Sequence, residues 1–97
     1  MNAGGIDGTP SFTGIASGVA TVGTTEVQLP ATPPGVITLR AAGANSGTIT
    51  IGVTGLSSLG GLTLSAGQMV TLYLNNLNIV YAIASGSGQK LEYLAQS

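Results

Sequence analysis

The stretch Thr48-Ile49-Thr50-Ile51-Gly52-Val53 places apolar side chains at every second position, with threonine or glycine between them. Successive side chains of a β-strand point to opposite faces of the sheet, so this alternation is typical of a strand with one buried face. The run Gly43-Ala44-Asn45-Ser46-Gly47 just before it is a strong turn signal. The two together predict a half-buried strand that is entered from a turn.

Similar short stretches recur on both sides of this one, separated by clusters of Gly, Pro, Ser and Asn. Including the first stretch, strands are expected at residues 19–22, 25–29, 36–41, 48–53, 62–64, 69–74, 79–84 and 90–95. A helix over 77–84 is the only competing possibility, and that segment is too rich in β-branched residues for one. The spacing predicts an all-β fold: a single small antiparallel β-sandwich or barrel, jelly-roll-like, with about eight short strands.

The apolar sides of these strands define the expected core. It comprises Ile37, Leu39, Ile49, Ile51, Val53, Val70, Leu72, Leu74, Tyr81, Ile83, Leu91 and Tyr93. The strand expected at 79–84 is apolar on both faces, which suggests that one face lies inside and the other near a partner.

The length of 97 residues indicates one domain, with a β-sandwich at 17–97 preceded by an N-terminal arm at 1–16. Glycines interrupt any period in the arm, and its apolar residues Ile6, Phe12 and Ile15 are isolated. Such an arm is either a flexible terminus or a segment that docks on a neighbouring subunit. Those three residues, with Leu56 and Leu59 of the Gly/Ser-rich loop, are the candidate partner contacts.

Charge is scarce in this chain. Only Asp7, Glu26, Arg40, Lys90 and Glu92 are charged, which is 5% of the residues, against about 25% in an ordinary soluble domain. A protein near zero net charge has little repulsion between its copies and tends to associate. We therefore expect a homo-oligomer. With only two basic residues, nucleic acid is not an expected partner.

Membrane insertion and secretion are not expected either. The longest wholly apolar run, 79–84, is far shorter than the ~20 residues that a membrane-spanning helix needs. The first five residues have neither the basic region nor the apolar stretch of a signal peptide. We expect the protein to be made in the cytoplasm.

The residue types that most chemistry requires are missing. The chain contains no His, Cys or Trp, which removes imidazole and thiolate metal ligands, cysteine nucleophiles and any Ser-His-Asp arrangement. Glu26 and Glu92 are expected at solvent-facing strand positions, where carboxylates are ordinarily surface charges. The sequence therefore predicts a protein that is not an enzyme and has no catalytic residue, no cofactor and no metal site.

Five segments occur in an order that resembles a known family. They are Ala44–Gly52, Gly61–Gln68, Val70–Leu72, Asn76–Ala84 and Gly88–Leu94. Over about residues 19–95 this order resembles small virion structural proteins of tailed bacteriophages, notably head decoration (cement) proteins. Similar sequences often have an acidic residue where this chain has Gln68, a difference that removes one more charge.

The resemblance implies a protein without an active site that binds where capsid subunits meet and reinforces the shell, often as a trimer. The expected partners are further copies of the chain and the major capsid protein, and the expected location is the capsid surface of the virion, after synthesis in the host cytoplasm. Two alternatives remain open. One is another virion part, in the neck, tail or head fibre, and the other is a carbohydrate-binding or adhesion module.

Overall fold

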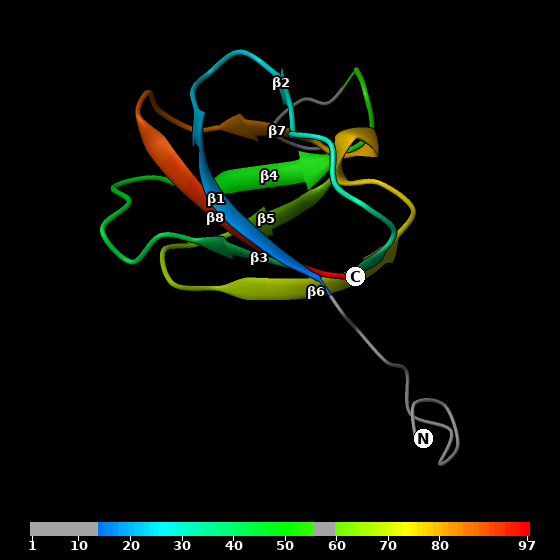
Figure 1. Cartoon of the computed structure of the whole chain (residues 1–97). Coiled ribbons are helices and arrows are strands. Elements are labelled where there is room, and N and C mark those ends of the chain that lie inside the picture. The colour runs from blue at the N-terminus through cyan, green and yellow to red at the C-terminus, as the bar shows by residue number, and fades with distance from the viewer. Residues whose placement is uncertain (1–13, 56–59) are drawn as a thin grey trace, which may run out of the picture.

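The computed structural model describes residues 14–55 and 60–97, which fold into eight strands and one short 3-10 helix. The elements are β1 (Ile15–Val22), β2 (Val27–Gln28), β3 (Gly35–Ala41), β4 (Ile49–Gly52), β5 (Leu62–Leu64), β6 (Met69–Leu74), η1 (Leu77–Ile79), β7 (Tyr81–Ala84) and β8 (Gln89–Gln96). Four strands in the order β1-β8-β3-β6 form sheet A, and four in the order β2-β7-β4-β5 form sheet B (Figure 1). All neighbouring strands are antiparallel.

The strands pair in a nested pattern around the β4–β5 connection. β4 pairs with β5, β3 with β6, β2 with β7, and β1 with β8. A long antiparallel hairpin rolled up on itself gives this order, and it is the topology of the eight-stranded jelly roll. The predicted all-β, jelly-roll-like sandwich of about eight strands is therefore confirmed.

Most connections cross from one sheet to the other, because only β4 and β5 are consecutive strands of the same sheet. Two of these crossovers are joined by hydrogen bonds. The backbone N–H groups of Thr32 and Asn78 both donate to Asn76 Oδ1, at 2.9 and 3.0 Å. The N–H of Leu77 donates to Thr32 Oγ1 at 3.0 Å. These bonds fix the loop between β2 and β3 against the turn between β6 and β7.

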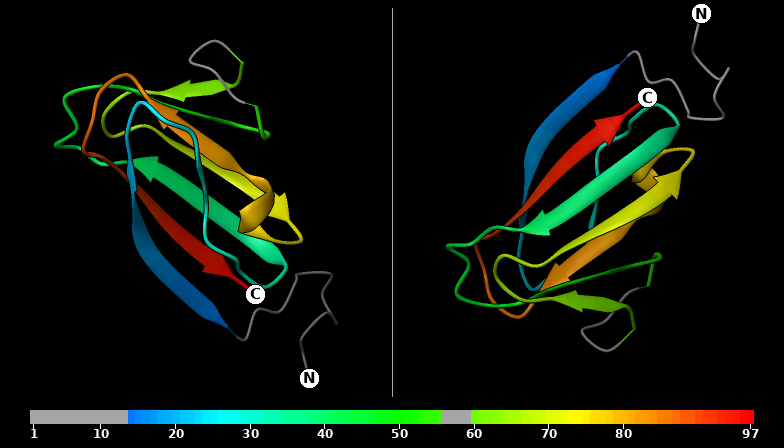
Figure 2. Two further views of the ribbon diagram at one scale, coloured as in Figure 1. Left: turned by 90° about the horizontal axis from the view of Figure 1, so that it is seen from above. Right: turned by 90° about the horizontal axis from the view of Figure 1, so that it is seen from below.

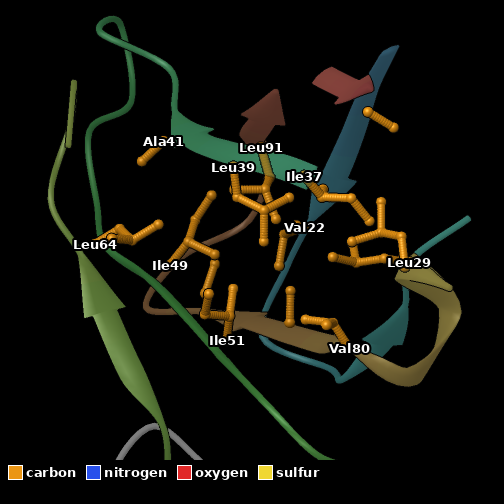
Figure 3. Close-up of a cluster of buried hydrophobic side chains, with 14 residues drawn as sticks. Val22, Leu29, Ile37, Leu39, Ala41, Ile49, Ile51, Leu64, Val80 and Leu91 are labelled. Carbon is orange, nitrogen blue, oxygen red and sulfur yellow. The ribbon is translucent and has the colours of Figure 1, made fainter. Parts of the chain in front are cut away.

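The core fills the space between the two sheets (Figure 3). Its largest fully buried side chains are Val22, Leu29, Ile37, Leu39, Ile49, Leu77 and Leu91. They come from both sheets and from the crossovers, so neither sheet has a core of its own. Burying one such side chain contributes about 1.5–3 kcal/mol.

The predicted core is confirmed at five positions: Ile37, Leu39, Ile49, Ile51 and Leu91 are buried. Four other predicted members, Val70, Leu72, Leu74 and Tyr93, are only partly buried but pack against the core.

Three core assignments were wrong. Val53 is 71% exposed because β4 ends one residue earlier, at Gly52. In β7 it is Ala82 and Ala84 that are buried, while Tyr81 and Ile83 are half-exposed on the other face of the strand. The expected strand at 79–84 therefore begins only at Tyr81. The two residues before it belong to the η1 turn and its C-cap.

The first strand is longer than expected. β1 begins at Ile15 rather than at residue 19, and Ile15 and Ala16 pair with Gln96 and Ala95 of β8. The last two residues of the predicted arm are thus part of sheet A. Residues 1–13 lie outside the described part of the chain.

At one end of sheet A the ends of neighbouring strands lie side by side. Gly14 N–H donates to the backbone oxygen of Ser97 at 2.7 Å, and Ser97 N–H donates to the oxygen of Gly14 at 2.9 Å. Beside them, Gly35 lies so close to the backbone oxygen of Gln96 that a β-carbon at this position would collide with it. Gly35 in turn pairs with Leu74 of β6. The start of β1 and the end of β6 therefore lie at the same end of the sheet.

Helical structure is slight in residues 14–55 and 60–97. The three residues of η1 form a single turn, and no helix in these ranges has the length and apolar character that a bilayer span requires.

Candidate interaction surface

The face of sheet A that points away from the core gathers side chains from all four of its strands. Residues paired across an antiparallel sheet point to the same side, so the register defines this face. It consists of Ile15, Ser17, Val19 and Thr21 from β1, Lys90, Glu92, Leu94 and Gln96 from β8, Val36, Thr38 and Arg40 from β3, and Met69, Thr71 and Tyr73 from β6. We call it the outer face of sheet A. Figure 2 shows the four strands lying side by side across it.

Exposed apolar side chains are concentrated here. Five of the eight large apolar residues that are exposed in the described part of the chain lie on this face: Ile15, Val19, Met69, Tyr73 and Leu94. Single exposed apolar residues are ordinary, but a group of them on one face marks an interaction site. Tyr73 is 80% exposed, and tyrosine and methionine are enriched in protein interfaces.

Several polar side chains of the same face are bonded to one another. Arg40 Nε lies 3.1 Å from Glu92 Oε1, across the β3–β8 pair. Lys90 Nζ donates to Thr21 Oγ1 at 2.8 Å. A charge that already has a partner keeps that partner when another protein covers the face, which lowers the cost of desolvating it. Arg40, Glu92 and Lys90 are held in this way.

A further hydroxyl pair lies on the same face, where Thr38 Oγ1 and Thr71 Oγ1 are 3.3 Å apart. Together the three polar pairs link all four strands, from Thr21 on β1 to Thr71 on β6. The exposed apolar side chains lie mostly on the two edge strands, β1 and β6. Exposed apolar side chains therefore lie beside polar groups that already have partners.

Among the strands that the structure describes, none pairs with the outer edge of β1 or of β6, and both edges are long. β1 has eight residues and β6 has six, and neither contains a charged residue or a proline. Natural proteins usually protect a free edge with charge, proline, a bulge or a very short strand. The edges of sheet B are short, with two residues in β2 and three in β5. Sheet A is therefore the sheet that can accept a further strand from a partner.

The predicted contact residues do not form a cluster in the described structure. Ile15 lies on the outer face of sheet A, at the edge strand β1, and is exposed. Ile6, Phe12, Leu56 and Leu59 lie outside the described residues. The other exposed apolar residues of this face were not among the predicted contacts: Val19, Met69, Tyr73 and Leu94. The alternation in MVTLYL does carry a signal for Met69 and Tyr73, since both are out of phase with Leu72 and Leu74.

The acidic residues lie at separate places. Glu92 is paired with Arg40 on the outer face of sheet A, and Glu26 precedes β2 rather than lying within the strand expected at 25–29. Among residues 14–55 and 60–97, no three His, Cys, Asp or Glu side chains come together in a group that could hold a metal ion.

No protein-family model matches the chain, and no curated protein is significantly similar to it. What the protein does must therefore be inferred from its own sequence, fold and surface.

Proposed function

We propose that this chain is a non-enzymatic structural protein of a virion: a capsid decoration, or cement, protein that binds between capsid subunits and stabilises the head. The observation that carries the proposal is the outer face of sheet A, where exposed apolar side chains border charges that are already paired. The resemblance of the sequence segments to phage head decoration proteins supplies the class of partner, the major capsid protein.

The rigidity of this face supports a binding role. Its side chains stand on hydrogen-bonded strands, so covering them costs less conformational freedom than ordering a loop would. Exposed Tyr73 and Met69 are of the types that contribute most to interfaces when they enter a partner's pocket. In this proposal, Tyr73 and Met69 make the main contacts with the capsid.

The free edges of sheet A support self-association. Because every neighbouring pair in the sheet is antiparallel, β1 and β6 run in opposite directions. The β6 edge of one copy can therefore pair antiparallel with the β1 edge of the next. A head-to-tail contact of this kind generates a ring when the rotation between copies closes, and an open filament when it does not. The trimer implied by the resemblance is one such ring.

A carbohydrate-binding module is the second candidate. The jelly roll is used by lectins as well as by viral capsid proteins, and a fold does not by itself determine function. The exposed ring of Tyr73 could stack on a sugar. A glycan array separates the two candidates, since specific binding to a sugar favours the module and contradicts the cement role.

The decisive experiment locates the protein on particles. Virions are purified from cells that carry the encoding genome and are examined by electron microscopy with antibodies against the chain. Regular labelling over the head is expected. Labelling at the neck or tail would assign the chain to another part of the virion, and particles without the chain would contradict a virion role.

A variant pair tests the surface itself. Tyr73→Asp puts a charge at the apolar border of the outer face, and Ala66→Asp puts the same charge in the exposed turn before β6. Heads that lack the protein are incubated with each variant and sedimented. We expect Ala66→Asp to bind like the unmodified chain and Tyr73→Asp to lose at least about tenfold in affinity, or about 1.4 kcal/mol. Equal binding by both variants would exclude this face as the attachment site.

A further inference from the structure

The backbone of β1 directs every second residue toward the outer edge of sheet A. Gly14 and Ser97 exchange both of their backbone hydrogen bonds. In an antiparallel pair, bonded positions alternate with positions that are not bonded, so every second residue from Gly14 onward faces β8. The residues between them have their N–H and C=O groups on the opposite side, toward the edge: Ile15, Ser17, Val19 and Thr21.

The backbone of β6 is arranged in the same way at the opposite edge of the sheet (Figure 2). Ala41 N–H donates to the backbone oxygen of Gln68 at 3.0 Å, so every second residue of β3, counted back from Ala41, faces β6. The partners of these residues are Val70, Leu72 and Leu74. The other residues of β6 have their backbone groups toward the edge: Met69, Thr71 and Tyr73. On both edges, the residues that can bond to a further strand are thus residues of the outer face.

The side chains of these residues alternate in the same order on the two edges. β1 has an isoleucine, a serine and a valine in turn, and β6 has a methionine, a threonine and a tyrosine. When β6 of one copy pairs antiparallel with β1 of another, one register sets Thr71 opposite Ser17. The same register sets apolar side chains opposite each other, in the pairs Tyr73–Ile15 and Met69–Val19.

Favourable cross-strand pairs distinguish this register from its neighbours. Aromatic side chains opposite β-branched ones, and threonine opposite serine, are among the pairs that stabilise a sheet. A shift of two residues in either direction sets Thr71 opposite an apolar side chain, Val19 or Ile15, and removes every match. A shift of one residue would bring backbone groups that already bond within one copy to the contact.

The sheet also continues without displacement in this register. Within one copy, Ile15 pairs with Gln96, Gln96 with Val36, and Val36 with Tyr73. The next residue in this row would be Ile15 of the second copy, so each row repeats from copy to copy. A displacement along the strands at every contact would generate an open filament about an axis parallel to them, and this register has none.

A two-fold contact between two β6 edges is the competing arrangement. It would set Thr71 opposite Thr71 and Tyr73 opposite Met69, but it would leave the eight-residue edge of β1 without a partner strand in both copies. The contact between β6 and β1 uses both edges, and natural proteins rarely leave a long edge open. Neither strand contains a charged residue that would oppose the pairing.

We propose that β6 of one copy pairs with β1 of the next in the register that sets Thr71 opposite Ser17, and that the surface for the capsid is complete only at this junction. One copy supplies Tyr73 and Met69, and the next supplies Ile15 and Val19, so four exposed apolar side chains form one strip. This inference rests on the self-association in the proposed function and deepens it by assigning the binding surface to two copies.

Single-cysteine variants test the register, because the chain contains no Cys. Thr71→Cys and Ser17→Cys, both at exposed positions, are mixed in equal amounts under mild oxidation. Residues directly opposite each other in a bonded pair have Cα atoms about 5.5 Å apart, which a disulfide can span. We expect disulfide dimers that contain one chain of each variant, and no disulfide dimers from either variant alone.

Val19→Cys mixed with Thr71→Cys is the matched control. In the proposed register these two residues are diagonal neighbours with Cα atoms about 7–8 Å apart, so they should cross-link at least about tenfold more slowly. Dimers from Thr71→Cys alone would establish the two-fold contact and overturn the proposal. Equal cross-linking of Ser17→Cys and Val19→Cys with Thr71→Cys, or no cross-linking of either, would overturn it as well.

Amide hydrogen exchange gives a second readout on the unmodified chain. As the protein concentration rises, the amides that point toward the two edges should exchange more slowly, on β1 at Ser17 and Val19 and on β6 at Thr71 and Tyr73. Protection on β6 alone would indicate the two-fold contact, and protection on neither strand would exclude edge pairing. Both results would overturn the proposal.

These measurements use purified protein, so they fail independently of the virion proposal. Heads labelled regularly by antibody, with no cross-link between Ser17→Cys and Thr71→Cys, would retain the cement role and exclude this contact. Cross-linked chains that are absent from virions would establish the contact and exclude the cement role.

Discussion

Sheet A and sheet B share one core but differ in the length of their strands and in the side chains they expose. The strands of sheet A have eight, eight, seven and six residues, whereas those of sheet B have two, four, four and three. Sheet A has the long free edges and the exposed apolar residues of the outer face. Sheet B has short edges, and Thr50 and Thr63, which point away from the core, are bonded to each other at 2.9 Å, with Thr50 only 3% exposed. The exposed apolar side chains thus accompany the long strands of sheet A, and the surface that we propose for binding lies on that sheet.

The largest expected effect tests whether the two sheets depend on one core. Leu39→Ala in sheet A and Ile49→Ala in sheet B each remove a fully buried side chain. Each should lower the free energy of unfolding by about 2–5 kcal/mol, measured by urea denaturation with circular dichroism. Val53→Ala, at an exposed position, should change it by less than about 0.5 kcal/mol. If only one of the two variants Leu39→Ala and Ile49→Ala lowered the free energy of unfolding by this amount, the sheets would be stabilised separately.

A smaller effect is expected where the crossovers between the sheets are joined. Asn76→Ala removes the oxygen that accepts hydrogen bonds from the N–H groups of Thr32 and Asn78. Leaving buried or half-buried donors without an acceptor should cost about 1–3 kcal/mol in the same assay. The neighbouring variant Asn75→Ala, at an exposed position, is the control and should be near neutral. Equal losses for the two variants would show that the bonds to Asn76 contribute nothing.

The third prediction compares the free edges directly. Thr71 in β6 and Thr63 in β5 are both exposed edge residues whose hydroxyls contact a threonine on the adjacent strand. Lysine on an edge strand opposes pairing with another chain. Thr71→Lys should therefore weaken self-association by about tenfold or more, or about 1.4 kcal/mol, and Thr63→Lys should leave it unchanged.

Light scattering over a range of protein concentrations measures this pair of variants. A monomeric mass for the unmodified chain at micromolar concentration would contradict the proposed oligomer. Equal weakening by the two lysines would mean that the edges of sheets A and B take part alike.

The smallest effect concerns the ion pair of the outer face. Exposed pairs such as Arg40–Glu92 contribute at most about 1 kcal/mol. A double-mutant cycle with Arg40→Met and Glu92→Gln should give a coupling energy within that limit. Because these charges are paired within one copy, self-association should be nearly independent of salt concentration. Steep weakening as salt increases would reveal ion pairs between copies.

The sequence predicted those parts of the fold whose side chains alternate clearly. The expected bounds of 62–64 and 69–74 agree with β5 and β6. β7 shows the limit of this signal, because Tyr81 and Ile83 on one face are as apolar as Ala82 and Ala84 on the other. Alternation cannot then decide which face is buried. Packing between the sheets decided it in favour of the small alanines.

The outer face could be predicted only in part, since it depends on the order of the strands. The alternation places Tyr73 and Leu72 on opposite faces of β6. Nothing in the sequence of β1 or β6 indicates that Ile15 lies level with Tyr73 across the sheet. That neighbourhood arises because β8 pairs with both β1 and β3, which are far apart in the chain. The apolar groove lined by Val53, Leu62, Leu72 and Ile79 likewise combines residues near β4, β5, β6 and η1, so neither surface could be found from one segment.

The pair of hydrogen bonds between Gly14 and Ser97 determines how the molecule responds to mechanical load. Because β1 begins where β8 ends, tension applied to these two residues would open the β1–β8 ladder one bonded pair at a time, as a zipper opens. The bonds would not share the load in shear. The same closeness allows a short linker to join Ser97 to Gly14 and turn β8 and β1 into a hairpin. The chain could then be cut open in the turn at 43–47 with all eight strands retained.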